Sequence, residues 1–168
     1  MMNLFTNCTS LESIDLSTFD TSKSLNFYQM FQGCMSLTSI NLGKWDTSEV
    51  RNMESMFEGC SKITSLDLSH FSTNQVSLMG KMFKGCSNLE YLNISNFNTK
   101  LVSDMTEMFY SITKIKVLNL TSFETTYINK YKDIFGGNTD LEVIINKKNN
   151  PIIILDPPQG VTIIDNTS

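Results

Sequence analysis

The chain has 168 residues, of which 40% are hydrophobic and 18% charged, a composition typical of one folded domain and not of a disordered chain. Residues 1–84 carry six basic and eight acidic side chains and residues 85–168 carry seven and nine, so neither half is basic and nucleic acid is not an expected partner. No apolar run is long enough to cross a bilayer, and we expect no membrane insertion.

A repeat of 26 residues organises the chain from its first residues. Four cysteines follow this spacing, and six phenylalanines keep it without a gap: Cys8, Cys34, Cys60 and Cys86, and Phe5, Phe31, Phe57, Phe83, Phe109 and Phe135. A threonine column follows the same period at residues 21, 47, 73, 99 and 125. A period of 26 lies within the range of about 20–29 residues typical of leucine-rich repeats. We therefore predict an α/β leucine-rich-repeat solenoid of about six repeats over residues 1–146.

Each repeat predicts a strand, a loop, a short helix and a turn, in that order. Ile40 and Leu42 are two residues apart and so face the same side of a strand. Val50, Met53, Met56 and Phe57 follow at offsets 0, 3, 6 and 7, which favours one face of a helix. Asp46, Thr47 and Ser48 are preferred helix caps, and Gly59-Cys60 ends the helix. The strands would form a parallel sheet on one face and the helices would line the other.

The two ends of the repeat region differ. Residues 1–8 match the second half of a repeat, so the first repeat is partial and we expect further repeats or a capping domain before Met1. At the other end, Ile152–Leu155 and Val161–Ile164 are β-rich runs joined by residues 156–160. These runs predict a C-terminal β-hairpin cap or tail over residues 147–168.

The repeat unit resembles one family closely. The matching motif stands as Phe19-Asp20-Thr21-Ser22, Trp45-Asp46-Thr47-Ser48-Glu49-Val50, Met53, Met56-Phe57 and Gly59-Cys60, and it extends over about 145 residues. This pattern resembles the BspA-like leucine-rich-repeat surface proteins. The resemblance implies a cell-surface or secreted protein, part of a longer chain, that adheres to a host or extracellular protein or glycan. The alternative is an intracellular or spacer repeat scaffold without a specific ligand.

The residues that usually carry chemistry do not form a catalytic pattern. The sequence holds no nucleophile elbow, phosphate-binding loop or dinucleotide fingerprint, so we predict no enzyme, no metal and no cofactor. For the cysteines we expect a buried column of free thiols, since Ile112 takes the same position in the fifth repeat. Disulfides between neighbouring repeats and a zinc site are the alternatives. His70, the single histidine, occupies a variable loop position and is expected to be exposed.

Recognition is expected on the outward side of the strands. One outward column reads Ser13, Ser39, Ser65, Tyr91, Val117 and Val143. Tyr91, Val117 and Val143 would then form an apolar strip beside Asn93 and Asn119, and an exposed apolar strip with a polar rim is typical of a binding site. These five residues are the candidate site. The alternative is that the C-terminal hairpin covers the strip, and the sequence indicates no particular oligomeric state.

Overall fold

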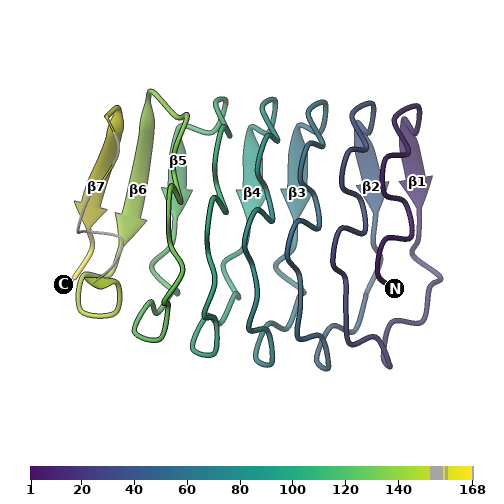
Figure 1. The fold of residues 1–168 in the computed structure, drawn as a ribbon, viewed down its shortest axis with the longest axis horizontal. Helices are drawn as coiled ribbons and strands as arrows, with labels where there is room; N and C mark the ends of the chain where they lie inside the picture. Colours follow the sequence, from purple (N-terminus) through teal and green to yellow (C-terminus); the bar gives the residue numbers. More distant parts are fainter. Residues whose placement is uncertain (152–156, 158, 168) are drawn as a thin grey trace.

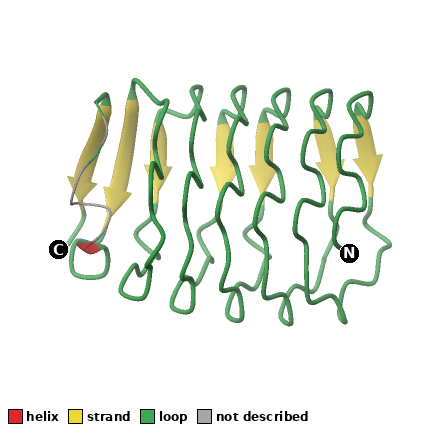
Figure 2. Ribbon diagram, in the orientation of Figure 1, coloured by secondary structure: helices red, strands yellow, loops and turns green. Residues whose placement is uncertain are grey.

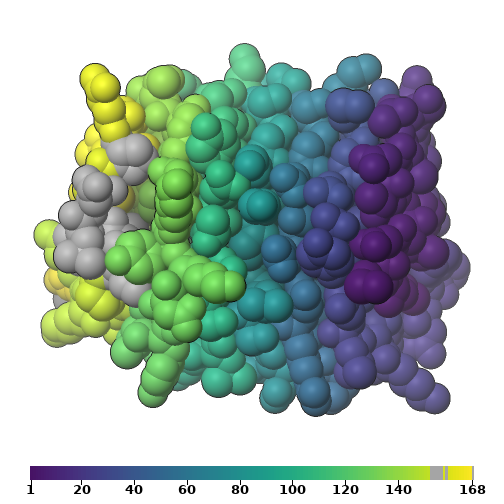
Figure 3. All heavy atoms as spheres, viewed as in Figure 1, coloured from purple at the N-terminus to yellow at the C-terminus, as the bar shows by residue number. Residues whose placement is uncertain are grey.

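The computed structural model describes residues 1–151, 157 and 159–167, and in these the chain forms a row of repeated units (Figure 1). Each 26-residue repeat, here called a unit, contributes one short strand. The strands are β1 (Ser13–Asp15), β2 (Ser39–Asn41), β3 (Ser65–Asp67), β4 (Tyr91–Asn93), β5 (Val117–Asn119), β6 (Leu141–Ile145) and β7 (Val161–Asp165). The units follow one another along the long axis in the order of the sequence (Figure 3).

The paired strands are parallel, as the repeat predicts, but they do not form one continuous sheet. Three groups are hydrogen-bonded: β1 with β2, β3 with β4, and β5 with β6 and β7. In the first two groups the paired residues are 26 apart, as with Ser13 and Ser39. The strands all lie on one side of the row, and Figure 2 shows loops and turns on the other sides.

The predicted helix over Val50–Phe57 is wrong, and helix is almost absent from the described residues. The chain instead runs beside the next unit and bonds to it. Four backbone N–H groups donate to carbonyls of the following unit: Met53 to Leu78 at 3.0 Å, Ser55 to Gly80 at 2.9 Å, Phe57 to Met82 at 3.0 Å and Gly59 to Lys84 at 2.7 Å. We call residues 52–59 and their equivalents in the other units the ladder segments. Isolated parallel bridges join these segments from Asn26 to Lys130.

The spacing of the strands explains why a ladder replaces the helices. An α-helix is about 10 Å across with its side chains, whereas hydrogen-bonded strands lie ~4.8 Å apart. Helices on one face would therefore force the units to spread apart on that side. A ladder segment has the same spacing as a strand, and a unit can stack closely on both sides.

Two left-handed backbone positions per unit shape the ladder segment. One column is polar throughout, at Asn3, Gln29, Ser55, Lys81, Glu107 and Asp133, with φ between 54° and 59°. The other lies four residues later, at Asn7, Gly33, Gly59, Gly85, Ser111 and Gly137, with φ between 55° and 74°. Such a conformation interrupts a helix, and glycine adopts it without the steric cost that other residues have.

The predicted phenylalanine column is confirmed as the centre of the core. Phe31, Phe57, Phe83 and Phe109 are fully buried. Neighbouring rings of the column, from Phe5 to Phe135, lie 5.4–6.1 Å apart at interplanar angles of 3–11°. Each buried phenylalanine contributes about 1.5–3 kcal/mol through the hydrophobic effect. Apolar burial therefore runs through the stack as a continuous column.

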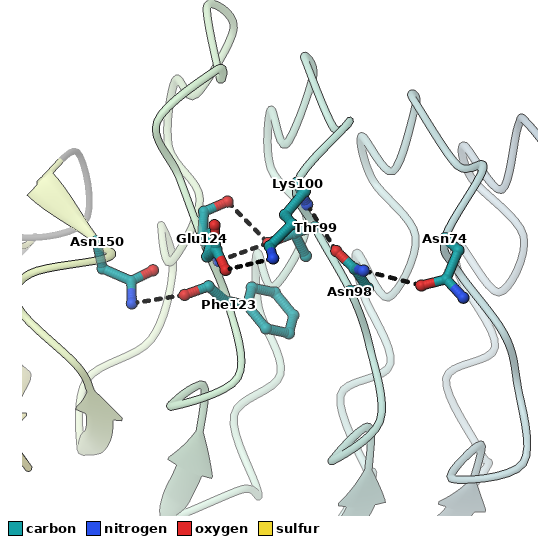
Figure 4. A network of polar contacts seen from close by, with 7 residues as sticks. All are labelled: Asn74, Asn98, Thr99, Lys100, Phe123, Glu124 and Asn150. Atoms are coloured by element: carbon teal, nitrogen blue, oxygen red, sulfur yellow. Dashed lines mark hydrogen bonds and ion pairs between the residues drawn. The ribbon is translucent and has the colours of Figure 1, made fainter.

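The threonine column joins neighbouring units and does not cap helices. Each hydroxyl donates to a backbone carbonyl of the next unit: Thr21 to Asp46 at 2.9 Å, Thr47 to Ser72 at 2.8 Å, Thr73 to Asn98 at 2.9 Å and Thr99 to Glu124 at 2.8 Å. For Thr47, Thr73 and Thr99, the residue whose carbonyl accepts this bond also donates its own N–H to the threonine hydroxyl. Glu124 does so to Thr99 at 2.7 Å (Figure 4). Buried threonines thus satisfy both backbone groups of one residue.

The last unit is one residue shorter than the others at its strand. Val117 of β5 pairs with Glu142 of β6, an offset of 25. Beyond β6, the predicted strand at Val161–Ile164 is confirmed as part of β7, which pairs with β6 in parallel. The other half of the predicted hairpin, Ile152–Leu155, lies outside the described residues. The described part of the C-terminal segment therefore continues the row of parallel strands.

Candidate functional site

Tyr91 and Val117 lie where the sequence analysis placed them, on the outward side of the strands, which we call the strand face. Their side chains are 52% and 51% exposed. They begin β4 and β5, so they come from neighbouring units. β7 extends the row beside β6 and leaves both side chains exposed. An apolar pair is therefore available on this face.

Val143 does not belong to the exposed strip, and its predicted outward position is wrong. The one-residue shortening aligns Val143 with the buried Leu118, and Val143 is itself fully buried. A shift of one residue turns every side chain of a strand to the opposite face. Glu142 takes the place beside Val117 and is exposed. The apolar strip thus ends at a carboxylate.

The first five strands each end at an aspartate or asparagine, whose side chain accepts a hydrogen bond from a backbone N–H two residues later. These residues are Asp15, Asn41, Asp67, Asn93 and Asn119. Asp67 Oδ1 accepts the N–H of Ser69 at 2.9 Å, and Asn119 Oδ1 accepts the N–H of Thr121 at 3.0 Å. Asp15 makes the same turn in the first unit with the N–H of Ser17 at 2.9 Å. The hydroxyl and the N–H of Ser69 lower the pKa of Asp67, and Asn93 lowers it further by hydrogen bonding. These carboxylates are ionised at neutral pH and fixed in orientation.

A hollow of about 360 Å³ opens on the strand face between β2 and β3, and we call it the first hollow. Its polar side chains are those of Asn41, Ser65, Asp67, Ser69 and His70. The predicted exposure of His70 is confirmed, and its ring meets Phe71 edge-on at 5.0 Å. The hollow lies where the two strands are not hydrogen-bonded to each other.

A second hollow of about 190 Å³ lies between β4 and β5, the other neighbouring strands of this row that are not paired. Asn93 and Asn119 both line it, together with Ser95, Thr121 and Ser122. The structure therefore brings two of the predicted site residues together around one opening. Sequence analysis missed both hollows, because the 26-residue repeat predicts the same pairing at every junction.

Three cysteines confirm the predicted column of buried thiols. Cys34, Cys60 and Cys86 are buried and free, and each Sγ donates to a phenylalanine carbonyl 29 residues earlier at 3.1–3.2 Å. Burial raises the pKa of Cys34 to about 11 and that of Cys86 to about 12, and it also raises the pKa of Cys60. Cys8, at the first unit, is exposed. The thiolate form is thus disfavoured in the core.

Asn138 occupies the cysteine position in the last unit, which the sequence analysis did not single out. Its Nδ2 donates to Phe109 O at 2.8 Å, the same kind of carbonyl that the thiols use, and to Phe135 O at 2.8 Å. The column therefore keeps one donor at this position with a different residue type. Asn138 has a structural role.

The ladder segments carry both acidic and basic side chains. Lys84 Nζ lies 2.7 Å from Glu107 Oε2 and 5.3 Å from the centre of the Tyr110 ring. Burial raises the pKa of Glu54, and the negative charge of Asp104 adds to the effect. In the part of the chain that the structure describes, no three His, Cys, Asp or Glu side chains converge as metal ligands would. That part also contains no helix long and apolar enough to cross a bilayer.

The repeated units define the chain as a repeat protein. It belongs to the family described as "Mycoplasma protein of unknown function, DUF285", which matches residues 1–91 and again residues 38–148. The two overlapping matches agree with a chain built from similar units. No significant match exists among curated proteins or among solved structures.

Proposed function

We propose that this chain is a non-catalytic recognition module that binds a protein or glycan partner through its strand face. The observation that carries the proposal is the exposed pair of Tyr91 and Val117 on neighbouring units, with Asn93 and Asn119 beside it. Aromatic and aliphatic groups surrounded by polar side chains are typical of contact sites. The short parallel strands and the Leu37-x-x-Ile40-x-Leu42 spacing, which is typical of a leucine-rich-repeat strand, support a leucine-rich-repeat solenoid of the BspA-like type, without the helices of the usual form.

The proposal places the module on a cell surface or in a secreted protein, as part of a longer chain. An antibody against the chain, applied to intact cells before and after protease treatment, tests this location. A band that is larger than this 19.0 kDa chain and disappears on treatment supports export. A protected band would contradict export and support the intracellular scaffold.

Paired variants test the strand face. Tyr91→Ala with Val117→Ser removes the exposed pair, and we expect at least tenfold weaker binding to the glycan or immobilised extracellular-matrix protein that retains the unaltered chain. Leu101→Ser with Tyr127→Ala is the matched control, because these side chains are 55% and 73% exposed in neighbouring units but lie outside the strands. Equal affinity of the folded Tyr91/Val117 variant and the unaltered chain would contradict the proposal.

A further inference from the structure

We propose that the two hollows are subsites for the hydroxyl groups of one extended, neutral glycan. This inference rests on the proposed function and names the ligand class of the same face. It starts from the backbone hydrogen bonds that neighbouring units exchange at the ends of their strands.

These bonds alternate along the row. The N–H that follows the strand donates to the next unit at three junctions: Leu16 to Asn41 at 2.8 Å, Leu68 to Asn93 at 2.9 Å and Leu120 to Ile144 at 2.8 Å. The equivalent N–H groups of Leu42 and Ile94 make no such bond within the described residues. Leu42 and Asp67 line the first hollow, and Ile94 and Asn119 line the second. Each hollow therefore presents a backbone donor and acceptor that the fold does not pair.

The unpaired N–H and carbonyl of each hollow favour a ligand that can both donate and accept hydrogen bonds. A hydroxyl does so with a single atom and can lie between an N–H on one strand and a carbonyl on the other. A peptide strand inserted between the two edges would need them two strand steps apart, about 10 Å, but neighbouring units stay one step apart: the rings of Phe31 and Phe57 are 5.5 Å apart and those of Phe83 and Phe109 5.8 Å. Hydroxyl-rich ligands thus fit the openings better than an added strand.

Charge argues for a neutral glycan. Asp67 lines the first hollow, and hydrogen bonds from Ser69 keep its carboxylate ionised at neutral pH. Glu142 lies beside Val117 on the next strand and places a second carboxylate on the same face. Sulfated, phosphorylated or sialylated chains would meet like charges here. A carboxylate that accepts hydrogen bonds from sugar hydroxyls has no such conflict.

The spacing of the hollows argues for an extended chain. The hollows are two strand steps apart, on the order of 10 Å at ~4.8 Å per step. This distance is close to the length of two β1,4-linked sugar residues. Tyr91, which begins β4, lies between the hollows and offers an exposed ring on which a sugar ring can stack. Three consecutive residues would therefore reach from one hollow to the other.

Isothermal titration of the whole chain with cellobiose, cellotriose and cellohexaose tests the proposal, beside the matching chitin oligosaccharides. Maltohexaose is the bent neutral control and a heparin hexasaccharide the anionic control. We expect at least tenfold tighter binding for three or more residues than for two, because only these occupy both hollows. Binding that does not depend on length, or a preference for heparin, would overturn the proposal.

A matched pair of variants locates the site. Ser65→Phe fills the first hollow, whereas Ser13→Phe places the same side chain at the equivalent residue of β1, where the strands are paired. We expect Ser65→Phe to weaken cellohexaose or chitohexaose binding at least tenfold and Ser13→Phe to leave it unchanged. Equal effects of the two variants would overturn the assignment.

The outcomes separate this inference from the proposed function. If the chain retains extracellular-matrix proteins through Tyr91 and Val117 but binds none of the neutral oligosaccharides, the glycan inference fails and the proposed function stands. If it binds neither class, both fail.

Discussion

The threonine column allows one structural prediction to be worked through in detail. Thr99 is 1% exposed, and its hydroxyl serves both backbone groups of Glu124 (Figure 4). Thr99→Val keeps the shape of the side chain but leaves the N–H and the C=O of Glu124 without their partner. A typical hydrogen bond contributes about 1 kcal/mol, and a buried polar group left unpaired costs about 1–3 kcal/mol. We therefore expect the free energy of unfolding to fall by about 2–4 kcal/mol.

The matched control is Thr99→Ser. It keeps both hydrogen bonds and removes one buried methyl group, which lowers the free energy of unfolding by about 1 kcal/mol. The nearby ion pair between Lys100 and Glu124, at 3.4 Å, cannot compensate for the valine change, because its lysine is 61% exposed and such pairs contribute ~0–1 kcal/mol. Urea unfolding with unchanged m-values measures both variants. A valine variant as stable as the serine variant would refute the argument that these hydroxyls join the units.

Three further predictions concern the backbone and the thiols. Gly59→Ala should lower the free energy of unfolding, measured in urea, by about 1–2 kcal/mol, because φ is 74° there. The added Cβ would meet Gly33 at an ordinary 3.7 Å, so the cost comes from the backbone conformation and not from a clash. Ser111→Gly, in the same column, should not destabilise the chain. Alkylation of the folded chain at pH 8 should modify Cys8 and spare Cys34, Cys60 and Cys86. Between pH 9 and 11 the unfolded chain releases thiol protons that the folded chain keeps. Stability should therefore fall as pH rises, by about 1.4 kcal/mol per pH unit for each buried thiol, and a flat profile in denaturant titrations would contradict this.

The sequence predicts the stack well because its columns are also contacts in space. Phe57 lies against Phe31 and Phe83 at ring distances of 5.5 and 6.1 Å, each 26 residues away. A gapless period forces this arrangement, since only stacking in register buries every apolar position. The exposure of Tyr91 and Val117 follows from the same alternation along the strand.

The helix could not be excluded on hydrophobic spacing alone. Val50, Met53, Met56 and Phe57 are all buried, as a helix face would be, but a ladder segment with left-handed turns buries the same positions. The pattern that distinguishes a ladder segment from a helix is a polar residue such as Ser55 four positions before a glycine such as Gly59. Both residues adopt a positive φ, which a helix does not allow. Val143 was misplaced for a different reason: the last unit is one residue shorter between Asn138 and Glu142, which leaves its phenylalanine and cysteine positions unchanged.

Among the first five strands, the paired junctions are those at which an Asp is followed by an Asn at the last strand position. Asn41 uses Oδ1 to accept the N–H of Gly43 and directs Nδ2 back to Asp15 Oδ2 at 3.2 Å, across a paired junction. Asn93 lies opposite Asp67 across the next paired junction and lowers the pKa of that carboxyl.

At the two unpaired junctions, β2–β3 and β4–β5, an Asp is not followed by an Asn. Asp67 follows Asn41, whose amide is already directed at Asp15, and Asn119 follows Asn93, which offers no carboxylate. β5 and β6 pair without such a contact, because β6 buries Leu141, Val143 and Ile145. A side-chain pattern of two units is thus superimposed on the 26-residue core repeat. The core sets the distance between units, and the alternating carboxylates and amides coincide with the junctions at which the strand face opens.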